Sequence, residues 1–260
     1  MKSFILKRII NSINRKFDYF YDFIMNKDIH SLLNSLLLLV RCRPIGSDRI
    51  IQIGRLKYYI RGGTTDFLYV QENWERDTYN KVKDIDYDSL IVIGACIGEW
   101  FVKLKENQFA VCNILIEPNP DSIRSSRINL LLNNINAICL QKAVSTCNDP
   151  LYLVINNLNT GSSYISELAI NEEIISVETI TLDEVINLYC LDCVKPLIMI
   201  DVEGMELDVI RSGASVLNSL NNFNIVFEYS KTNQIEEISA LLRDVSFTLL
   251  DKDNILIQRK

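Results

Sequence analysis

Residues that could bind a nucleotide-like molecule follow three of the apolar segments in the chain. Gly94 and Gly98 form a glycine turn after one segment, Glu117 ends the next, and Asp201 and Glu203 follow a later one. Glycines let a ligand approach the backbone closely, and a carboxylate in the place of Glu117 can accept hydrogen bonds from both hydroxyls of a ribose. The interval from Gly94 to Glu117 is close to the ~20 residues typical of such a pair. Together these residues predict an adenosine-binding site.

Asp201 and Glu203 add a second kind of chemistry. In the sequence IMIDVEGMELDVI, an apolar run delivers both carboxylates to one short segment. One carboxylate can remove a proton from a substrate hydroxyl while the other orients the substrate; a divalent cation between them is compatible but not required. The alternative is a helix N-terminus decorated with acids to suit its dipole, with Glu206 on the same helix face as Glu203. Because that alternative explains Asp201 less well, we predict that Asp201 and Glu203 are catalytic.

The segments that must position these residues alternate between short apolar runs and amphipathic stretches beyond residue 88. This alternation predicts an α/β fold with a parallel sheet covered by helices on both faces. Because ligands bind at the carboxyl ends of such strands, the glycines and acids are expected to share one crevice. Strands are expected at residues 90–93, 114–116, 137–140, 197–200 and 225–227, and helices at 98–106, 120–133, 182–190, 203–219 and 232–243.

Local signals support these assignments. Asn119-Pro120 and Thr181-Leu-Asp-Glu184 have the residue types of helix N-caps. Antiparallel hairpins are expected at residues 49–61 and at 247–258, the second turning at Asp253-Asn254.

The stretch 146–180 does not alternate cleanly. It is expected to hold extra strands and a loop near the active site. Within it, the polar segment 159–166 fits a substrate loop over the cleft and, equally well, a plain surface connection.

Composition limits the class of protein. The 260 residues, 48% of them hydrophobic, suffice for one α/β domain with an accessory segment. A net charge of -6 argues against binding to the nucleic-acid backbone, so no nucleic-acid partner is expected. The seven scattered cysteines suit reduced core thiols in a cytoplasm. Cys190 and Cys193 form a lone CxxC motif, and no metal site is expected because a second ligand pair is lacking and His30 is the only histidine.

Residues 1–45 differ from the rest and predict an N-terminal helical extension, with a domain of residues 46–260 behind it. Within 1–25, apolar residues recur at helical spacing and basic residues accompany them. The favoured interpretation is a helix pair that packs on the domain or on a partner subunit. The alternative is peripheral contact with the inner face of an anionic membrane through residues 1–25. No apolar run reaches the ~20 residues of a membrane span, so a cytoplasmic location is expected.

Several sequence motifs occur in the order typical of a known family. They resemble the motifs of the FkbM family of S-adenosylmethionine-dependent methyltransferases. In chain order, the motifs are RGGTTD, IGACIGEW, IEPNP, KAVS, VETITLDEV and IMIDVEGMELDVIRSGASVL. The resemblance covers about residues 55–230. It implies a Rossmann-like class I methyltransferase fold with a mostly parallel seven-stranded sheet, S-adenosylmethionine as the donor, and commonly O-methylation of sugars or natural products.

The resemblance also implies roles for individual residues. Asp201 and Glu203 fall on the family's Asp-Val-Glu-Gly element, close to where the methyl group leaves. The glycine loop would line the methionine part of the cofactor, Glu117 would hold the ribose, and the KAV segment would pass beside the adenine. The implied cofactor-binding residues are Gly94, Ala95, Cys96, Gly98, Glu117, Pro118, Lys142, Ala143 and, from the upstream element, Asp66 and Glu72.

Two departures from the family pattern fall in the glycine loop. The family reads Asp-Val-Gly-Ala-Asn-Ile-Gly, where this chain has Val92 and Cys96 in place of the acid and the amide. Loss of a charged hydrogen bond costs roughly 1.5–3 kcal/mol, or about ten- to a hundredfold in affinity. We expect a weakened but usable site. The alternative is an inactive methyltransferase-like scaffold or partner protein; an NAD-dependent oxidoreductase is disfavoured because Trp100 and Phe101 stand where its third glycine would be.

The residues and the family resemblance together predict an O-methyltransferase that acts on a hydroxyl group, and the resemblance implies a sugar in a surface glycan or its precursor as the acceptor. Asp201 or Glu203 would remove the hydroxyl proton, and the second carboxylate would hold the acceptor. His30 is a less favoured candidate for the base because it lies in the N-terminal helical region.

Overall fold

The computed structural model describes residues 46–75, 77–105, 110–146, 149–155, 163–166, 174–229 and 234–259. The predicted helical extension of residues 1–45 lies outside the described residues, as does the first half, 159–162, of the predicted loop 159–166, whereas residues 164–166 form a strand. Among the described residues, no helix is long and apolar enough to cross a membrane.

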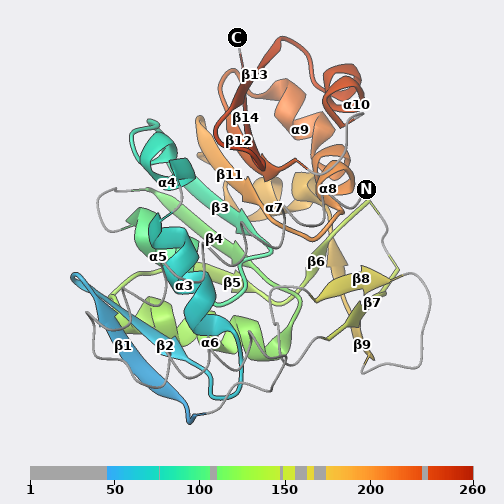
Figure 1. The fold of residues 1–260 in the computed structure, drawn as a ribbon. Helices are drawn as coiled ribbons and strands as arrows, with labels where there is room; N and C mark the ends of the chain where they lie inside the picture. The colour runs from blue at the N-terminus through green and yellow to red at the C-terminus, as the bar shows by residue number, and fades with distance from the viewer. Residues whose placement is uncertain are drawn as a thin grey trace, which may run out of the picture.

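A seven-stranded sheet forms the centre of the fold, as predicted (Figure 1). Its strand order is β13-β14-β12-β11-β3-β4-β5, and every neighbouring pair from β12 to β5 is parallel. The two strands at the β13 edge are antiparallel. The bounds are Ser89–Ile93 for β3, Cys112–Ile116 for β4, Ile138–Leu140 for β5, Pro196–Ile200 for β11, Asn224–Glu228 for β12, Val245–Leu249 for β13 and Asn254–Arg259 for β14.

The chain leaves β3 toward β4 and β5 on one side and later returns to build β11 and β12 on the other side. β3 and β11 are therefore adjacent at the point where the strand order reverses. In open parallel sheets, this reversal leaves a crevice outside the carboxyl ends of the strands. The fold thus places Gly94, which follows β3, beside Asp201, which follows β11.

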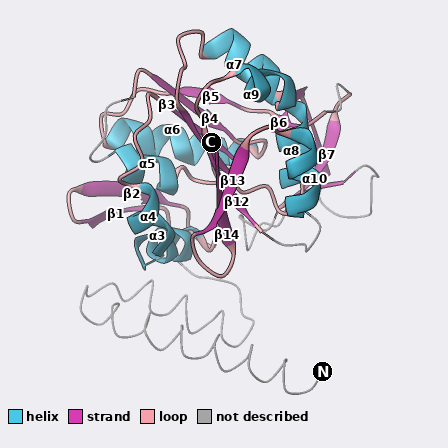
Figure 2. Cartoon of the chain, turned by 90° about the horizontal axis from the view of Figure 1, so that it is seen from above, coloured by secondary structure: helices cyan, strands magenta, loops and turns pink. Residues whose placement is uncertain are grey.

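Helices cover both faces of the sheet, as Figure 1 and the view from above in Figure 2 show. One face packs against α7 (Leu182–Tyr189), α8 (Glu206–Ser212), α9 (Ala214–Ser219) and α10 (Gln234–Leu241). The other packs against α3 (Asp66–Glu75), α4 (Asp77–Val82), α5 (Glu99–Lys105) and α6 (Pro120–Leu132).

The central strands are apolar along their whole length because helices cover the sheet on both faces. Along β3, Ile91 and Ile93 belong to one core cluster, whereas Leu90 and Val92 belong to the other. Successive side chains of a strand point to opposite faces, so a strand between two helical layers is apolar at every position. All five residues of β3 and all five of β11 are buried.

Smaller elements surround the sheet. The predicted first hairpin is formed by β1 (Arg49–Ile53) and β2 (Leu56–Ile60). The predicted extra strands of residues 146–180 are β7 (Leu151–Val154), β8 (Tyr164–Ser166) and β9 (Ile174–Val177), which form a separate antiparallel sheet. A parallel pair joins β6 (Ala143–Val144) to β10 (Thr179–Ile180). In the last hairpin, the turn lies before Asn254, because β14 already begins at that residue.

The N-caps are confirmed, but the helix predicted at 203–219 is wrong in its bounds. Asn119 caps α6 and Thr181 with Glu184 forms a capping box on α7. The predicted single helix is two helices, α8 and α9, that meet at Gly213. A Cβ at Gly213 would lie 2.6 Å from a Leu182 side-chain carbon, so the close packing of α7 requires glycine there.

Glu203 and Glu206 do not share a helix face, in contrast to the alternative considered for them. Glu203 lies in the turn before α8 and has a φ of 54°, in the left-handed region. Glu206 is the first residue of α8, and its side chain accepts a hydrogen bond from the Gly204 amide at 2.9 Å. The helix-dipole explanation therefore applies to Glu206 and not to Glu203.

Candidate active site

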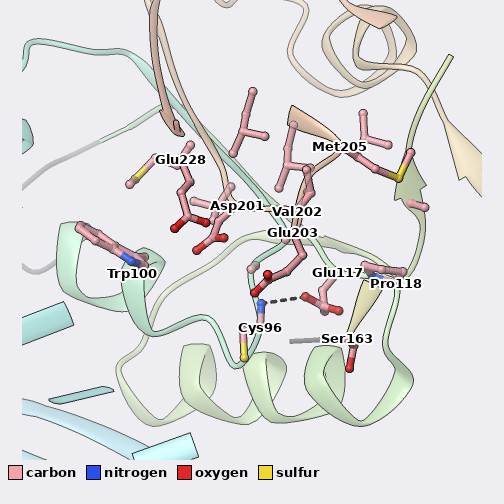
Figure 3. A pocket seen from close by; sticks show the side chains of 18 of the residues that line it. Cys96, Trp100, Glu117, Pro118, Ser163, Asp201, Val202, Glu203, Met205 and Glu228 are labelled. Carbon is pink, nitrogen blue, oxygen red and sulfur yellow. Dashed lines mark hydrogen bonds between the residues drawn. The ribbon is translucent and has the colours of Figure 1, made fainter. Parts of the chain in front are cut away.

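A pocket opens at the carboxyl ends of β3, β4, β11 and β12 (Figure 3). Most of the residues predicted to bind cofactor or to catalyse line this single pocket. They are Gly94, Ala95, Cys96, Glu117, Pro118, Lys142, Ala143, Asp201 and Glu203.

Gly94 makes the closest backbone contact in the site. Its φ is +73°, and a Cβ there would lie 1.8 Å from the carbonyl oxygen of Asp201. The amides of Gly94 and Ala95 donate to the Ile116 carbonyl at 3.0 and 3.1 Å. The loop therefore lies across the ends of β4 and β11 with no room for a side chain at position 94.

Cys96 occupies the tightest part of the loop. Its φ is 46°, a conformation that costs most L-residues energy and that Asn and Gly tolerate best. Its amide donates to Glu117 Oε2 at 2.8 Å, and its carbonyl accepts from the Ser126 hydroxyl at 2.8 Å. The next carbonyl, of Ile97, accepts from the Asn129 amide at 2.8 Å. Three side chains thus hold a loop that lacks the family's acid and amide.

Ser126 and Asn129 were missed by the sequence reasoning. Both are buried polar residues on the inner face of α6. Asn129 also accepts a hydrogen bond from the backbone of Tyr59 in β2, so it ties the first hairpin to the glycine loop. A polar residue on a helix is usually solvated, and only the periodicity of α6 places these two on its buried side.

Glu117 is buried at 8% exposure, with both carboxylate oxygens in use. Oε2 accepts from the Cys96 amide at 2.8 Å and Oε1 from the Asn119 amide at 2.9 Å. Burial raises the pKa of this carboxyl to about 7, against the two amide bonds, which lower it. A carboxylate has about four lone-pair sites, so each oxygen can still accept one further hydrogen bond from the pocket side.

The ends of β11 and β12 bring three further acids to the pocket. Glu203, Asp201 and Glu228 all line the pocket (Figure 3). Although Glu203 is exposed as a residue, the partial burial of its carboxyl raises its pKa to about 7. The charges of Asp201, Glu228 and Glu206 act in the same direction. Glu228 was missed, although it follows an apolar run just as Glu117 and Asp201 do.

The remaining walls are mostly apolar and aromatic. Val144, Leu153, Ile165 and Met205 line the side near β6 and the small sheet, together with Ala143 and Pro118. Lys142 lines the same side and forms an ion pair with Glu178 at 2.8 Å. Tyr69 and Trp100 also line the pocket, and Figure 3 shows Trp100 on the same side as Asp201 and Glu228. The pocket therefore has one apolar end and one acidic end.

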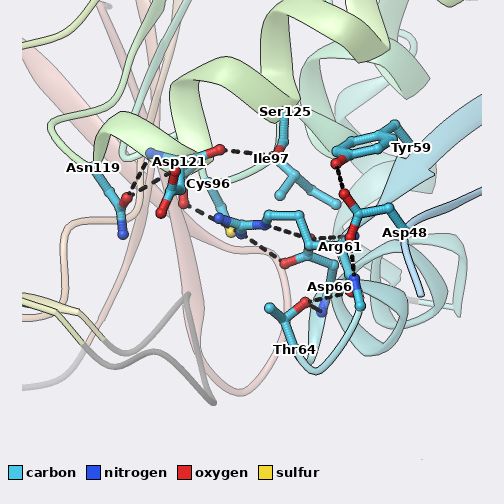
Figure 4. A network of polar contacts seen from close by, with 12 residues as sticks. Asp48, Tyr59, Arg61, Thr64, Asp66, Cys96, Ile97, Asn119, Asp121 and Ser125 are labelled. Carbon is cyan, nitrogen blue, oxygen red and sulfur yellow. Dashed lines mark hydrogen bonds and ion pairs between the residues drawn. The ribbon is translucent and has the colours of Figure 1, made fainter. Parts of the chain in front are cut away.

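Gly98 and Asp66 do not line this pocket. Gly98 packs between β4 and α6, where a Cβ would lie 3.2 Å from Leu115 and 3.3 Å from Ser126. The buried carboxylate of Asp66 instead binds Arg61 in a bidentate ion pair at 2.7 and 2.8 Å (Figure 4). Glu72 lies in α3, but its side chain is outside the described part of the chain.

Arg61 links the upstream element to the glycine loop and α6. Beyond its ion pair with Asp66, its guanidinium donates to the Ser122 hydroxyl at 3.4 Å, and its positive charge lowers the pKa of Glu117. Arg61 and Asp66 therefore stabilise the scaffold behind the loop (Figure 4). Among the described residues, no group of three or more His, Cys, Asp or Glu side chains could hold a metal ion.

The fold resembles several solved methyltransferases at low sequence identity. M. jannaschii TYW2 in complex with AdoMet has a TM-score of 0.50 and 11% identity over 82% of this chain and 84% of that one. A Pyrococcus abyssi tRNA (uracil-54, C5)-methyltransferase in complex with S-adenosyl-L-homocysteine has a TM-score of 0.44 and 9% identity over 82% of this chain, which spans 44% of that protein. A putative SAM-dependent methyltransferase from Streptococcus mutans has a TM-score of 0.45 and 8% identity, with 92% and 66% of the two chains covered. A comparison with curated proteins finds no match.

A family model identifies the chain more directly. The model of the methyltransferase FkbM domain matches residues 93–249, which is more than half of the sequence and includes the glycine loop, Glu117 and all three pocket acids. The match includes the sequence motifs around Gly94, Glu117 and Asp201, whereas the upstream RGGTTD motif lies outside it. The chain therefore belongs to the FkbM family of S-adenosylmethionine-dependent methyltransferases.

Proposed function

We propose that the protein transfers a methyl group from S-adenosylmethionine to a hydroxyl oxygen and that Glu203 accepts the hydroxyl proton. The observation that carries this proposal is the pocket itself. It combines the glycine loop and Glu117 with a carboxyl group whose pKa is raised to about 7. The sugar of a surface glycan, or of its precursor, is the proposed acceptor.

The two ends of the pocket fit the parts of the donor. The apolar residues near β6 suit a planar adenine, with Lys142, Ala143 and Pro118 at its edge. The free lone pairs of Glu117 suit the ribose hydroxyls. The carboxylates of Asp201, Glu203 and Glu228 suit a cation. When bound, S-adenosylmethionine supplies a methyl group on a positively charged sulfur.

Glu203 is the best-placed proton acceptor. A general base works best when its pKa lies near the operating pH, because it is then ionised and still basic. Partial burial and the neighbouring acids raise the pKa of the Glu203 carboxyl to that range. Its left-handed backbone conformation, φ 54°, sets its side chain on the pocket wall rather than along α8. Such strain is often found at functional positions.

Asp201 and Glu228 are proposed to hold the acceptor. Both line the pocket beside Glu203, on neighbouring parallel strands. A sugar offers several hydroxyl donors close together, and paired carboxylates accept hydrogen bonds from two of them at once. This arrangement supports a polyhydroxylated acceptor. A divalent cation between the carboxylates of Asp201 and Glu228 is an alternative. Loss of activity when the enzyme is treated with a metal chelator would support it.

The test is incubation with labelled S-adenosylmethionine and a cell-glycan extract, using wild type, Glu203→Gln and the control Glu236→Gln on the exposed face of α10. Loss of a general base is expected to lower the rate about 10²- to 10⁴-fold, with kcat/KM of the wild type rising with pH to a plateau above about pH 7. The control is expected to keep full activity. Equal activity of Glu203→Gln, with an unchanged pH profile, would show that another group accepts the proton.

A further inference from the structure

Three cysteine thiols meet at the amino edge of the sheet, opposite the methyl-transfer pocket. Cys112 is the first residue of β4, Cys190 caps the C-terminus of α7, and Cys193 lies in the turn before β11. The Cys190 side chain is in hydrogen-bond contact with those of both Cys112 and Cys193. Cys112 also donates to the Tyr189 carbonyl at 3.0 Å. The sequence shows only the CxxC pair, because Cys112 is far away along the chain.

The backbone between Cys190 and Cys193 is a tight turn. The Cys193 amide donates to the Cys190 carbonyl at 3.1 Å. A turn closed by such a bond brings its first and fourth Cα atoms within about 7 Å, which overlaps the roughly 4.4–6.8 Å found across disulfides. The spacing of the two backbone positions in this turn is therefore compatible with a disulfide.

The cluster is buried but reachable. Cys190 is 3% exposed and Cys193 is 9% exposed. A surface pocket at this edge is nevertheless lined by all three cysteines, together with Ser89 and Asn113. Bulky reagents are excluded by this burial, whereas a molecule as small as hydrogen peroxide can enter. Reactive cysteines are those with both access and thiolate character.

The thiols differ in their readiness to ionise. The hydrogen bond from the Cys193 thiol lowers the pKa of Cys190 below its usual range, against burial and the charge of Asp88, which raise it. The shared hydrogen bond and burial raise the pKa of Cys193. Burial raises the pKa of Cys112 to about 12. Of the three thiols, Cys190 is therefore the one that the surroundings favour as a thiolate.

We propose that Cys190 and Cys193 form a peroxide-reactive dithiol site that closes to an intrachain disulfide. The Cys190 thiolate attacks one oxygen of hydrogen peroxide; the O–O bond breaks, hydroxide leaves, and the sulfur is oxidised to a sulfenic acid. The Cys193 sulfur then attacks the sulfenic sulfur, the S–S bond forms, and the S–O bond breaks. The departing hydroxide takes the thiol proton as water. In sum, two thiols and one peroxide give one disulfide and two waters.

The test uses the reduced full-length protein, treated with equimolar hydrogen peroxide and mapped by non-reducing peptide mass spectrometry. A Cys190–Cys193 disulfide that dithiothreitol reverses is expected in wild type and in the control Cys139→Ser, whose cysteine lies half-buried in β5. Cys193→Ser is expected to accumulate a sulfenic acid at Cys190, which dimedone traps once the treated protein is unfolded in urea. In Cys190→Ser, neither product is expected.

The pH dependence provides a second readout that does not depend on a variant. Because the pKa of Cys190 is lowered, the rate of disulfide formation is expected to fall less between pH 7 and pH 5 than the roughly hundredfold fall expected for an ordinary thiol. The proposal is overturned if Cys190 stays reduced while Cys139 is oxidised, or if the disulfide forms equally fast in Cys190→Ser. Neither result would affect the methyl-transfer proposal, which concerns the other edge of the sheet.

Discussion

Replacement of Cys96 by asparagine is expected to stabilise the protein, although it changes a residue of the cofactor loop. The φ of 46° at this position is left-handed. That region costs an ordinary L-residue about 1–2 kcal/mol, and Asn recovers part of this because its short polar side chain bonds locally. We expect Cys96→Asn to gain roughly 0.5–1 kcal/mol in the free energy of unfolding.

The comparison variants separate backbone strain from side-chain contacts. Cys96→Gly removes the strain but increases the conformational entropy of the unfolded chain, which costs about 0.4–1 kcal/mol in the free energy of unfolding. Its net effect is therefore expected to be small. Cys96→Val, with a branched Cβ, is expected to lose about 1–2 kcal/mol or more. Cys139→Asn in β5 is the control, because its backbone is a regular strand and Asn is disfavoured there.

Urea unfolding measures the series. With an m-value of about 3 kcal/mol/M for a chain of this size, a gain of ~1 kcal/mol raises the midpoint by about 0.3 M at unchanged m. The reasoning would be refuted if Cys96→Asn unfolded at a lower urea concentration than wild type while Cys96→Val did not. That result would mean that the thiol's own contacts outweigh the strain of the loop.

Three further predictions concern the scaffold, the buried carboxylate and the N-terminal segment. Arg61→Lys replaces a bidentate ion pair with a single ammonium group, and we expect the free energy of unfolding in urea to fall by roughly 1.5–3 kcal/mol. The comparison variant is Lys195→Ala, which removes the exposed ion pair with Asp86. A smaller loss in Arg61→Lys than in Lys195→Ala would contradict a stabilising role for Arg61. Because the pKa of Glu117 is raised to about 7, its protonated form favours the folded state, so the contribution of this carboxyl group to stability is expected to be full below about pH 4.5 and to be lost as the pH rises through about 7. Glu117→Gln is expected to flatten this decline in a series of urea midpoints, and an equally steep decline in the variant would refute the assignment. Deletion of residues 1–45 is expected to reduce binding to anionic liposomes if that segment contacts membrane, and unchanged sedimentation with liposomes would exclude the contact.

The sheet and most of its helices were predictable because each strand is buried on both faces. Runs such as Leu90–Ile93 are apolar at every position, which a one-sided strand would not be. The helix break at Gly213 was not predictable, since it depends on the approach of Leu182 from another helix. The same is true of Glu203, whose left-handed backbone separates it from α8.

The site was predictable where strand ends determine it and not where tertiary contacts do. Glu117 and Asp201 follow apolar runs and line the pocket, and the same rule applied to β12 would have found Glu228. Asp66 was expected to bind the cofactor, but it does not line the pocket and its carboxylate binds Arg61. The support of the loop by Ser126 likewise required the packing of α6 against it.

Calorimetric titration with S-adenosylmethionine tests the central claim most directly, that the glycine loop and Glu117 form a working donor site. We expect heat of binding from wild type and from the control Glu236→Gln. Glu117→Gln should bind at least tenfold more weakly, because one buried amide of the loop loses its acceptor. Absence of binding to folded wild type at millimolar S-adenosylmethionine would contradict the account and favour a non-catalytic scaffold.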